Sequence, residues 1–94
     1  MFWTYILYSL ILDRYYIGQT DDIRSRIKHH LEGDTSYTRQ ASDWQLLFLQ
    51  EHATRTAAVR LERDIKHKKN RLSIQRYLKD QRNLISHPIG IADW

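Results

Sequence analysis

The fold is decided by residues 3–18, which read Trp3-Thr4-Tyr5-Ile6-Leu7-Tyr8-Ser9-Leu10-Ile11-Leu12-Asp13-Arg14-Tyr15-Tyr16-Ile17-Gly18. The first eight are mostly aromatic, β-branched or aliphatic, with no helix breaker, and a second such run begins at Tyr15 after a polar Asp-Arg pair. Two runs of this kind joined by a polar turn are typical of a β-hairpin. We therefore predict two short strands, the second closed by Gly18.

The periodicity changes after the hairpin. Apolar residues now recur at every fourth position: Ile23, Ile27 and Leu31. This spacing predicts an amphipathic helix, with Thr20 as its N-cap, residues 21–22 in its first turn and Gly33 at its C-terminal end. Arg26 and His30 are also four residues apart, so they share a face beside the apolar stripe.

The second half of the chain predicts one more strand and two more helices. Residues 33–43 are polar and irregular, which indicates a loop with at most a helical turn. The apolar succession within residues 44–50 predicts a central strand. Helices are predicted for residues 57–69, with Thr56 as N-cap, and for residues 73–80. The predicted core positions of the longer helix are Ala58, Leu61 and Ile65.

Length and composition limit the classes of protein. A chain of 94 residues with 41% hydrophobic residues predicts one folded domain, and the absence of cysteine excludes disulfides, thiolate metal sites and a thiol nucleophile. The first residues lack a signal peptide's basic start, and no apolar run reaches the ~18 residues of a membrane span. We expect a cytoplasmic protein without a membrane partner.

The positive charge is unevenly distributed. The net charge is +4, but residues 55–82 hold ten cations and three acids, so that segment carries +7 and the remainder −3. A basic helical segment favours an acidic partner such as nucleic acid, although a solvated helix surface has the same pattern.

The motifs together resemble one family. Trp3-Thr4-Tyr5 and Tyr16-Ile17-Gly18 lie eleven residues apart at their tyrosines, the predicted first helix reaches His30, and a later helix contains Leu61-Glu62-Arg63-Asp64-Ile65-Lys66. In this order they resemble the GIY-YIG endonuclease family, in its stand-alone single-domain bacterial branch. The resemblance covers residues 2–79, so we predict a nuclease domain over residues 1–82 and a C-terminal tail, 83–94, docked on it.

The resemblance implies an α/β (α+β) fold, a small three-stranded antiparallel sheet flanked by helices, that hydrolyses DNA with one divalent metal. Tyr5 would be the general base or the hydroxyl that positions water, and Tyr16 a second hydroxyl beside the scissile phosphate. Arg26 would bind phosphate, and His30 would polarise Tyr5 or contact phosphate. Glu62 would hold Mg²⁺ or Mn²⁺, because one carboxylate suits a hard cation that keeps most of its waters.

The remaining predicted residues would contact the substrate. Gly18 would let a phosphate approach the backbone, and an asparagine that follows the acidic helix in the family points to Asn70. The predicted backbone contacts are Tyr37, Arg39, Lys66 and Lys69. Phosphate contacts carry no sequence information, so specificity would come from DNA structure, single-stranded or branched, or from a homodimer or a recruiting protein partner.

Each of these residues also has a purely structural interpretation. Tyr5 and Tyr16 are ordinary strand residues, with Tyr15 competing for the second position, and Glu62 has an ion-pair partner in Lys66 four residues on. Two other functions therefore stay open: a nucleic-acid-binding module that keeps the fold without cutting, and an adaptor that recruits proteins through its apolar tail. If the chain is a nuclease, DNA repair or recombination is the expected setting.

Overall fold

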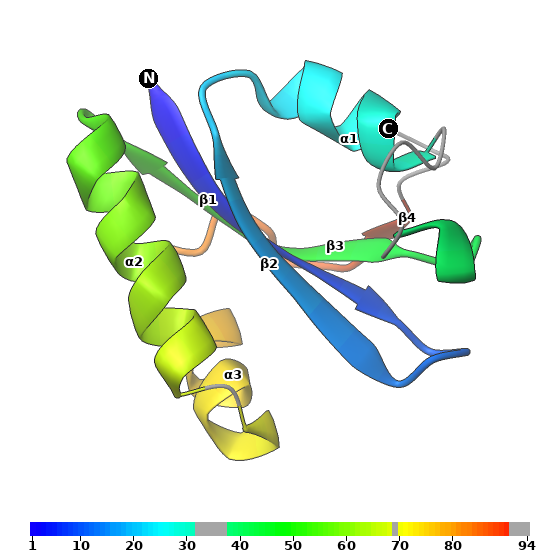
Figure 1. Cartoon of the computed structure of the whole chain (residues 1–94). Coiled ribbons are helices and arrows are strands. Elements are labelled where there is room, and N and C mark those ends of the chain that lie inside the picture. Colours follow the sequence, from blue (N-terminus) through cyan, green and yellow to red (C-terminus); the bar gives the residue numbers. More distant parts are fainter. Residues whose placement is uncertain (32–37, 69, 91–94) are drawn as a thin grey trace.

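The computed structural model describes residues 1–31, 38–68 and 70–90, apart from the side chains of residues 31 and 38. The elements in chain order are β1 (Phe2–Ser9), β2 (Arg14–Thr20), α1 (Ile23–Leu31), the 3-10 helix η1 (Thr38–Gln40), β3 (Gln45–His52), α2 (Arg55–His67), α3 (Arg71–Leu78) and β4 (Ile89–Gly90). The strands form one antiparallel sheet in the order β2-β1-β3-β4 (Figure 1). The predicted order of strands and helices is confirmed.

The sheet has one strand more than predicted in the described part of the chain. β4 lies in the C-terminal tail and pairs only with the start of β3, through Gln45 and Leu46. Two residues are too few to show an alternating pattern, which is why the sequence predicted three strands. Ile85 and Ile89 pack against the core, so this part of the tail is docked on the domain. Residues 91–94 lie outside the described residues.

The hairpin register brings Gly18 opposite Tyr5, and Tyr16 opposite Leu7. The prediction that Gly18 closes the second strand is wrong, because β2 continues to Thr20, which pairs with Trp3. Gly18 therefore lies within the ladder rather than at its end.

Helices cover both faces of the sheet, α1 on one and α2 with α3 on the other (Figure 1). Tyr5 and Leu7 of β1 pack with Ile27 of α1, whereas Ile6 packs with Ile65 of α2 and Ile74 of α3. This division follows from the alternation of side chains along a strand.

β3 serves both faces through an irregularity. Its register with β1 shifts so that Leu46 opposes Leu7 while Phe48 opposes Ile6, which leaves Leu47 as an extra residue. Residues two positions apart on a regular strand share a face, and the bulge instead places Leu46 in the layer with α1 and Phe48 in the layer with α2 and α3. The uninterrupted apolar run predicted as a central strand is thereby explained.

The helix starts differ from prediction by about two residues. α1 is capped by Asp22, whose Oδ1 accepts from the N–H of Ser25 at 3.1 Å, and Thr20 stays in the sheet, so residues 21–22 precede the first turn. α2 is capped by Thr54 rather than Thr56, and α3 by Asn70. The predicted core of α2 is confirmed: Ala58 and Ile65 are buried and Leu61 is partly buried.

Asn83 fixes the chain after α3. Its amide nitrogen donates to the carbonyls of Leu47 and Leu78, each at 3.0 Å, and its Oδ1 accepts from the N–H groups of Leu49 and Ile85, each at 3.0 Å. The side chain thus joins β3, α3 and the tail. None of the helices in the described ranges is long and apolar enough to cross a membrane.

Candidate active site

The centre of the site is a hydrogen bond between β1 and α1. The hydroxyl of Tyr5 lies 2.9 Å from Nε2 of His30, and the two side chains are 1% and 2% exposed. The amphipathic pattern of α1 explains the approach, because burying Ile27 turns His30 toward the same face of the sheet as Tyr5. The structure therefore brings together two residues that the sequence separates by 25 positions.

His30 is held in its neutral form. Burial, helped by the positive charges of Arg26 and His29, lowers the pKa of His30 to about 4. A neutral imidazole carries a proton on one nitrogen and a lone pair on the other. Nδ1 of His30 has no hydrogen-bond partner among the described residues. The imidazole ring therefore interacts with the hydroxyl of Tyr5 through Nε2.

Tyr5 is held protonated. Burial, followed by the nearby Tyr16 and the negative charge of Glu62, raises the pKa of Tyr5 well above its usual range, and only the charge of Arg26 opposes this. Arg26 and Glu62 are thus within electrostatic reach of the hydroxyl. Tyr5 can donate a proton to His30, but it needs added positive charge to become a base.

Tyr16 is the tyrosine of the pair that joins the site. Its ring stacks on Tyr5 with centroids 6.3 Å apart and lies edge-on to His30 at 4.8 Å. Tyr15 packs instead against Tyr8 on the other face, with ring centroids 4.8 Å apart. The alternative left open by the sequence is settled by register, since Tyr16 opposes Leu7.

Gly18 makes room for the ring of Tyr5. A Cβ on Gly18 would lie 2.6 Å from Cζ of Tyr5 and closer still to the hydroxyl. Real Cβ atoms do not approach so closely, so any larger residue would displace the ring. The glycine is therefore required by the tyrosine, whatever its role toward a phosphate.

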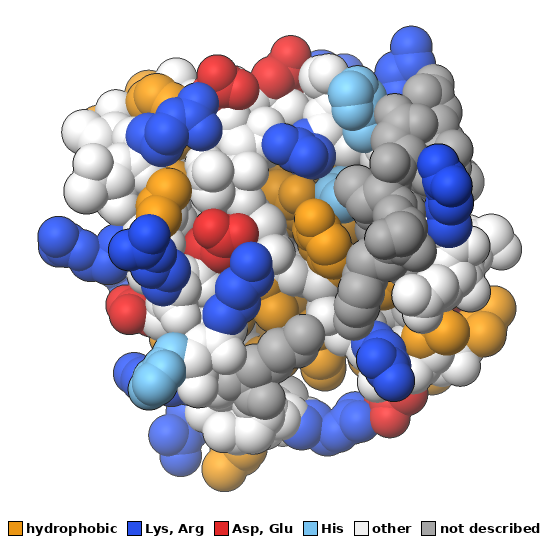
Figure 2. All heavy atoms as spheres, in the orientation of Figure 1, with side chains coloured by type: hydrophobic (Ala, Val, Ile, Leu, Met, Phe, Trp, Pro, Cys, Tyr) orange, Lys and Arg blue, Asp and Glu red, His pale blue; other side chains and the backbone are white. Residues whose placement is uncertain are grey.

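Glu62 supplies the acidic side of the site from α2. Its side chain is 18% exposed and its Oε2 lies 3.2 Å from Nζ of Lys66, the ion pair expected at this spacing. Figure 2 shows acidic and basic side chains mixed on the surface over α2. The carboxylate of Glu62 is thus half-buried and paired with one cation, Lys66.

Two contacts that the sequence did not indicate hold α2 in place. The hydroxyl of Thr4, fully buried, donates to the carbonyl of Ala58 at 2.9 Å and lies 3.0 Å from Nε2 of His52. Ala58 is one helical turn before Glu62, so this bond fixes where the carboxylate stands. A threonine in an apolar strand looks like an ordinary β-former, and no local signal distinguishes it.

Arg55 makes the second contact. Its guanidinium pairs with Asp21 at 3.1 Å, donates to Gln19 at 3.2 Å and covers the ring of Phe2, 4.9 Å from its centroid. The start of α2 is thereby tied to the ends of β1 and β2. In the sequence Arg55 is only one of ten cations of the basic segment.

Other predicted residues lie outside this cluster. Arg39 is exposed on η1, and His29 is exposed, as expected of a bystander. Asn70 caps α3 by accepting from the N–H of Ser73 at 2.9 Å, so its predicted substrate contact stays a prediction beside a structural role. Tyr37 and Lys69 lie outside the described residues.

The donor set fits a hard divalent cation that keeps its waters. Within residues 1–31, 38–68 and 70–90, no three His, Asp or Glu side chains converge to enclose a metal. A single half-buried carboxylate such as Glu62 suits Mg²⁺ or Mn²⁺, which bind through one or two carboxylates and take other contacts from water and substrate phosphates. It does not suit zinc, which is bound by three or four side chains.

The comparisons with known proteins point to one family. A family model described as the GIY-YIG catalytic domain matches residues 1–77. The comparison with curated proteins and the comparison with solved structures gave no match. The matched region contains β1 to most of α3, and with it every residue of the cluster described above.

Proposed function

Because this chain belongs to the GIY-YIG family, we propose that it is an endonuclease that hydrolyses phosphodiester bonds of DNA with one divalent metal ion held by Glu62. The observation that carries the proposal is the buried contact of Tyr5, Tyr16 and His30 within electrostatic reach of Arg26 and Glu62. Packing alone gives no reason to place these charges around a buried hydroxyl.

The proton path begins at Tyr5. Its hydroxyl would take the proton of the attacking water while its own proton moves to Nε2 of His30, so no isolated tyrosinate forms. His30 is a weak proton acceptor, because burial and the charge of Arg26 lower its pKa. An anionic phosphate paired with Arg26 would offset the part due to that charge, and we propose that substrate binding thereby makes His30 a better proton acceptor.

The other residues hold the phosphate. The guanidinium of Arg26 would bind a nonbridging oxygen, and Lys66, already beside Glu62, would hold a second one. The hydroxyl of Tyr16 would face the scissile group next to Tyr5. When bound, the metal ion supplies Lewis-acid stabilisation of the charge that develops on the leaving oxygen.

Cleavage of defined DNAs tests the proposal. The purified protein with Mg²⁺ or Mn²⁺ is expected to cut at least one of single-stranded, duplex, flapped and branched DNA. A parallel assay with RNA of the same sequence shows whether cleavage requires deoxyribose. Tyr5→Phe and Glu62→Ala should lose cleavage. Tyr8→Phe, which removes a hydroxyl from the same strand, should keep it. Salt-sensitive binding without cleavage would favour the non-catalytic module.

Location and assembly rest on the sequence alone. We propose a cytoplasmic protein that acts in DNA repair or recombination, directed by DNA structure, by a homodimer or by a recruiting protein. Light scattering of the purified chain with and without DNA separates the homodimer from the other two. The adaptor hypothesis would instead require that truncation from residue 85 abolishes function while Glu62→Ala does not.

A further inference from the structure

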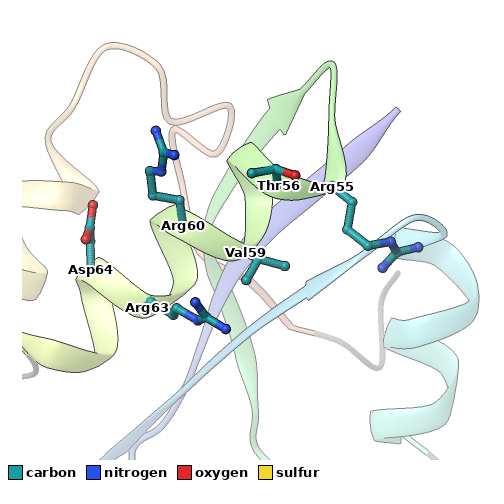
Figure 3. A pocket seen from close by; sticks show the side chains of 6 residues that line it. All are labelled: Arg55, Thr56, Val59, Arg60, Arg63 and Asp64. Carbon is teal, nitrogen blue, oxygen red and sulfur yellow. The ribbon is translucent and has the colours of Figure 1, made fainter.

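A hollow of about 450 Å³ lies on α2, apart from the cluster of Tyr5, Tyr16 and His30. Figure 3 shows its arginine side chains spread around Val59. All the lining residues belong to α2: Arg55, Thr56, Val59, Arg60, Arg63 and Asp64. Three cations thus surround an apolar floor with one acid at the end of the hollow.

The three arginines are not equivalent. Arg55 is committed to Asp21 and Gln19, as described above. Arg60 and Arg63 are exposed, and within the described residues neither has an ion pair. The hollow therefore offers two guanidinium groups that form no ion pair within the described part of the chain, with the carboxylate of Asp64 at its edge.

The hollow begins on the face of α2 next to Glu62 and extends round the helix away from it. Each residue of an α-helix is turned by about 100° from the one before, so Arg63 lies on the face beside Glu62, whereas Arg60 is turned by about 160° from it. Arg60 and Arg63, the two arginines of the hollow without an ion pair to a described residue, are three residues apart, which corresponds to about 4.5 Å along the axis. Their long side chains can therefore reach neighbouring phosphates of one strand.

We propose that this hollow binds the sugar–phosphate backbone of DNA that flanks the cleavage site. This inference rests on the proposed nuclease function and adds Arg60 and Arg63 as residues that position the substrate. The planar guanidinium matches phosphate geometry, and Val59 offers an apolar surface to a sugar. The hollow is open and lined by exposed side chains, which hold a small anion weakly, whereas a long polyanion gains from counterion release at each contact.

The test measures binding without metal, so that cleavage does not interfere. The affinity for fluorescein-labelled single-stranded and duplex oligonucleotides is followed against salt for the wild type and for Arg60→Gln/Arg63→Gln. Losing two phosphate contacts should make the slope of log affinity against log salt shallower by about 1.4 on single strands and about 1.8 on duplex. In the presence of metal, the double variant should raise KM more than it lowers kcat.

A matched control removes the same charge elsewhere. Arg24→Gln/Lys28→Gln takes two exposed cations from the side of α1 turned away from Arg26, and should keep the wild-type slope. If the slope of log affinity against log salt becomes shallower by the same amount in both double variants, the net positive charge of the protein explains the binding and the hollow is not a specific site. An unchanged slope in Arg60→Gln/Arg63→Gln also overturns the inference.

The two proposals fail separately. If the wild type cuts no DNA but Arg60→Gln/Arg63→Gln has a shallower slope of log affinity against log salt, the nuclease proposal is refuted and the hollow remains a nucleic-acid-binding site. A wild type that cuts, with a double variant that binds and cuts like it, refutes the hollow alone. Binding of acidic polypeptide such as polyglutamate with the same dependence on Arg60 and Arg63, and none to DNA, would assign the hollow to a protein partner and overturn the inference.

Discussion

Acidification should destabilise the protein through His30 before its carboxylates become protonated. The folded-state pKa of His30 is about 4, below the ordinary 6.5, so between these values the unfolded chain takes up a proton that the folded protein does not. Stability from this group is fully present above pH 6.5 and is lost as the pH falls toward 4. At about 1.4 kcal/mol for each pH unit, the loss is about 3 kcal/mol.

Other groups whose pKa values change on folding can be distinguished from His30 by the direction of the pKa shift and by the pH range in which they affect stability. Burial also lowers the pKa of His52, which adds to the loss in the same range. Arg71, Ser9 and Arg82 hold the pKa values of Asp13, Asp43 and Asp80 below the ordinary 3.8, so their contribution is lost only at lower pH. Among the described groups with shifted pKa values, the two histidines therefore account for the loss of stability above pH 4.

Urea unfolding at a series of pH values measures this loss. The wild type should lose about 3 kcal/mol of unfolding free energy between pH 6.5 and 4, and His30→Gln, which keeps a polar partner for Tyr5, should lose only the part due to His52. His67→Gln, at an exposed position of α2, is the control and should follow the wild type. A His30→Gln profile as steep as the wild-type profile would show that His30 does not cause the loss of stability.

Three further changes test the packing and the caps. Gly18→Ala forces a Cβ against Tyr5 and should cost about 1–3 kcal/mol in urea unfolding together with loss of cleavage; an unchanged stability would mean that the ring moves freely. Asn83→Ala leaves four backbone groups without their partner and should lower the unfolding free energy by at least about 2 kcal/mol, while the folded fraction still cuts DNA. Thr54→Ala should cost about 1 kcal/mol as the loss of an N-cap, and Thr56→Ala under half of that; equal losses would contradict the observed start of α2.

Alternation and helical periodicity were enough to predict the order of the elements. They were not enough to place the helix starts, because threonines stand at both position 54 and position 56 and each is a good cap by itself. The choice depends on β3 ending at His52 and on Thr54 keeping an extended backbone, with φ −130°. β2 likewise extends to Thr20 because Trp3 is there to pair with it. Both are tertiary effects that local propensity does not contain.

The site residues were predicted through the family resemblance, and the structure adds why they belong together. Periodicity put Arg26 and His30 on one face but did not show that His30 would meet Tyr5, since that contact depends on how α1 lies on the sheet. The choice of Tyr16 over Tyr15 depends on the hairpin register. No sequence pattern indicated the role of Thr4, because its buried hydroxyl finds its partner, the carbonyl of Ala58, only once α2 has packed on the sheet.

We propose that Glu62 serves metal-dependent cleavage and does not only form an ion pair with Lys66. The most direct measurement is single-turnover DNA cleavage across a titration of Mn²⁺ for the wild type, Glu62→Gln and the control Glu51→Gln, which removes an exposed carboxylate of β3. We expect Glu62→Gln to fold and bind DNA but to cut about a thousandfold more slowly, corresponding to the several kcal/mol a metal supplies, while Glu51→Gln behaves like the wild type. Equal cleavage by Glu62→Gln and the wild type, with the same metal dependence, would contradict this proposal.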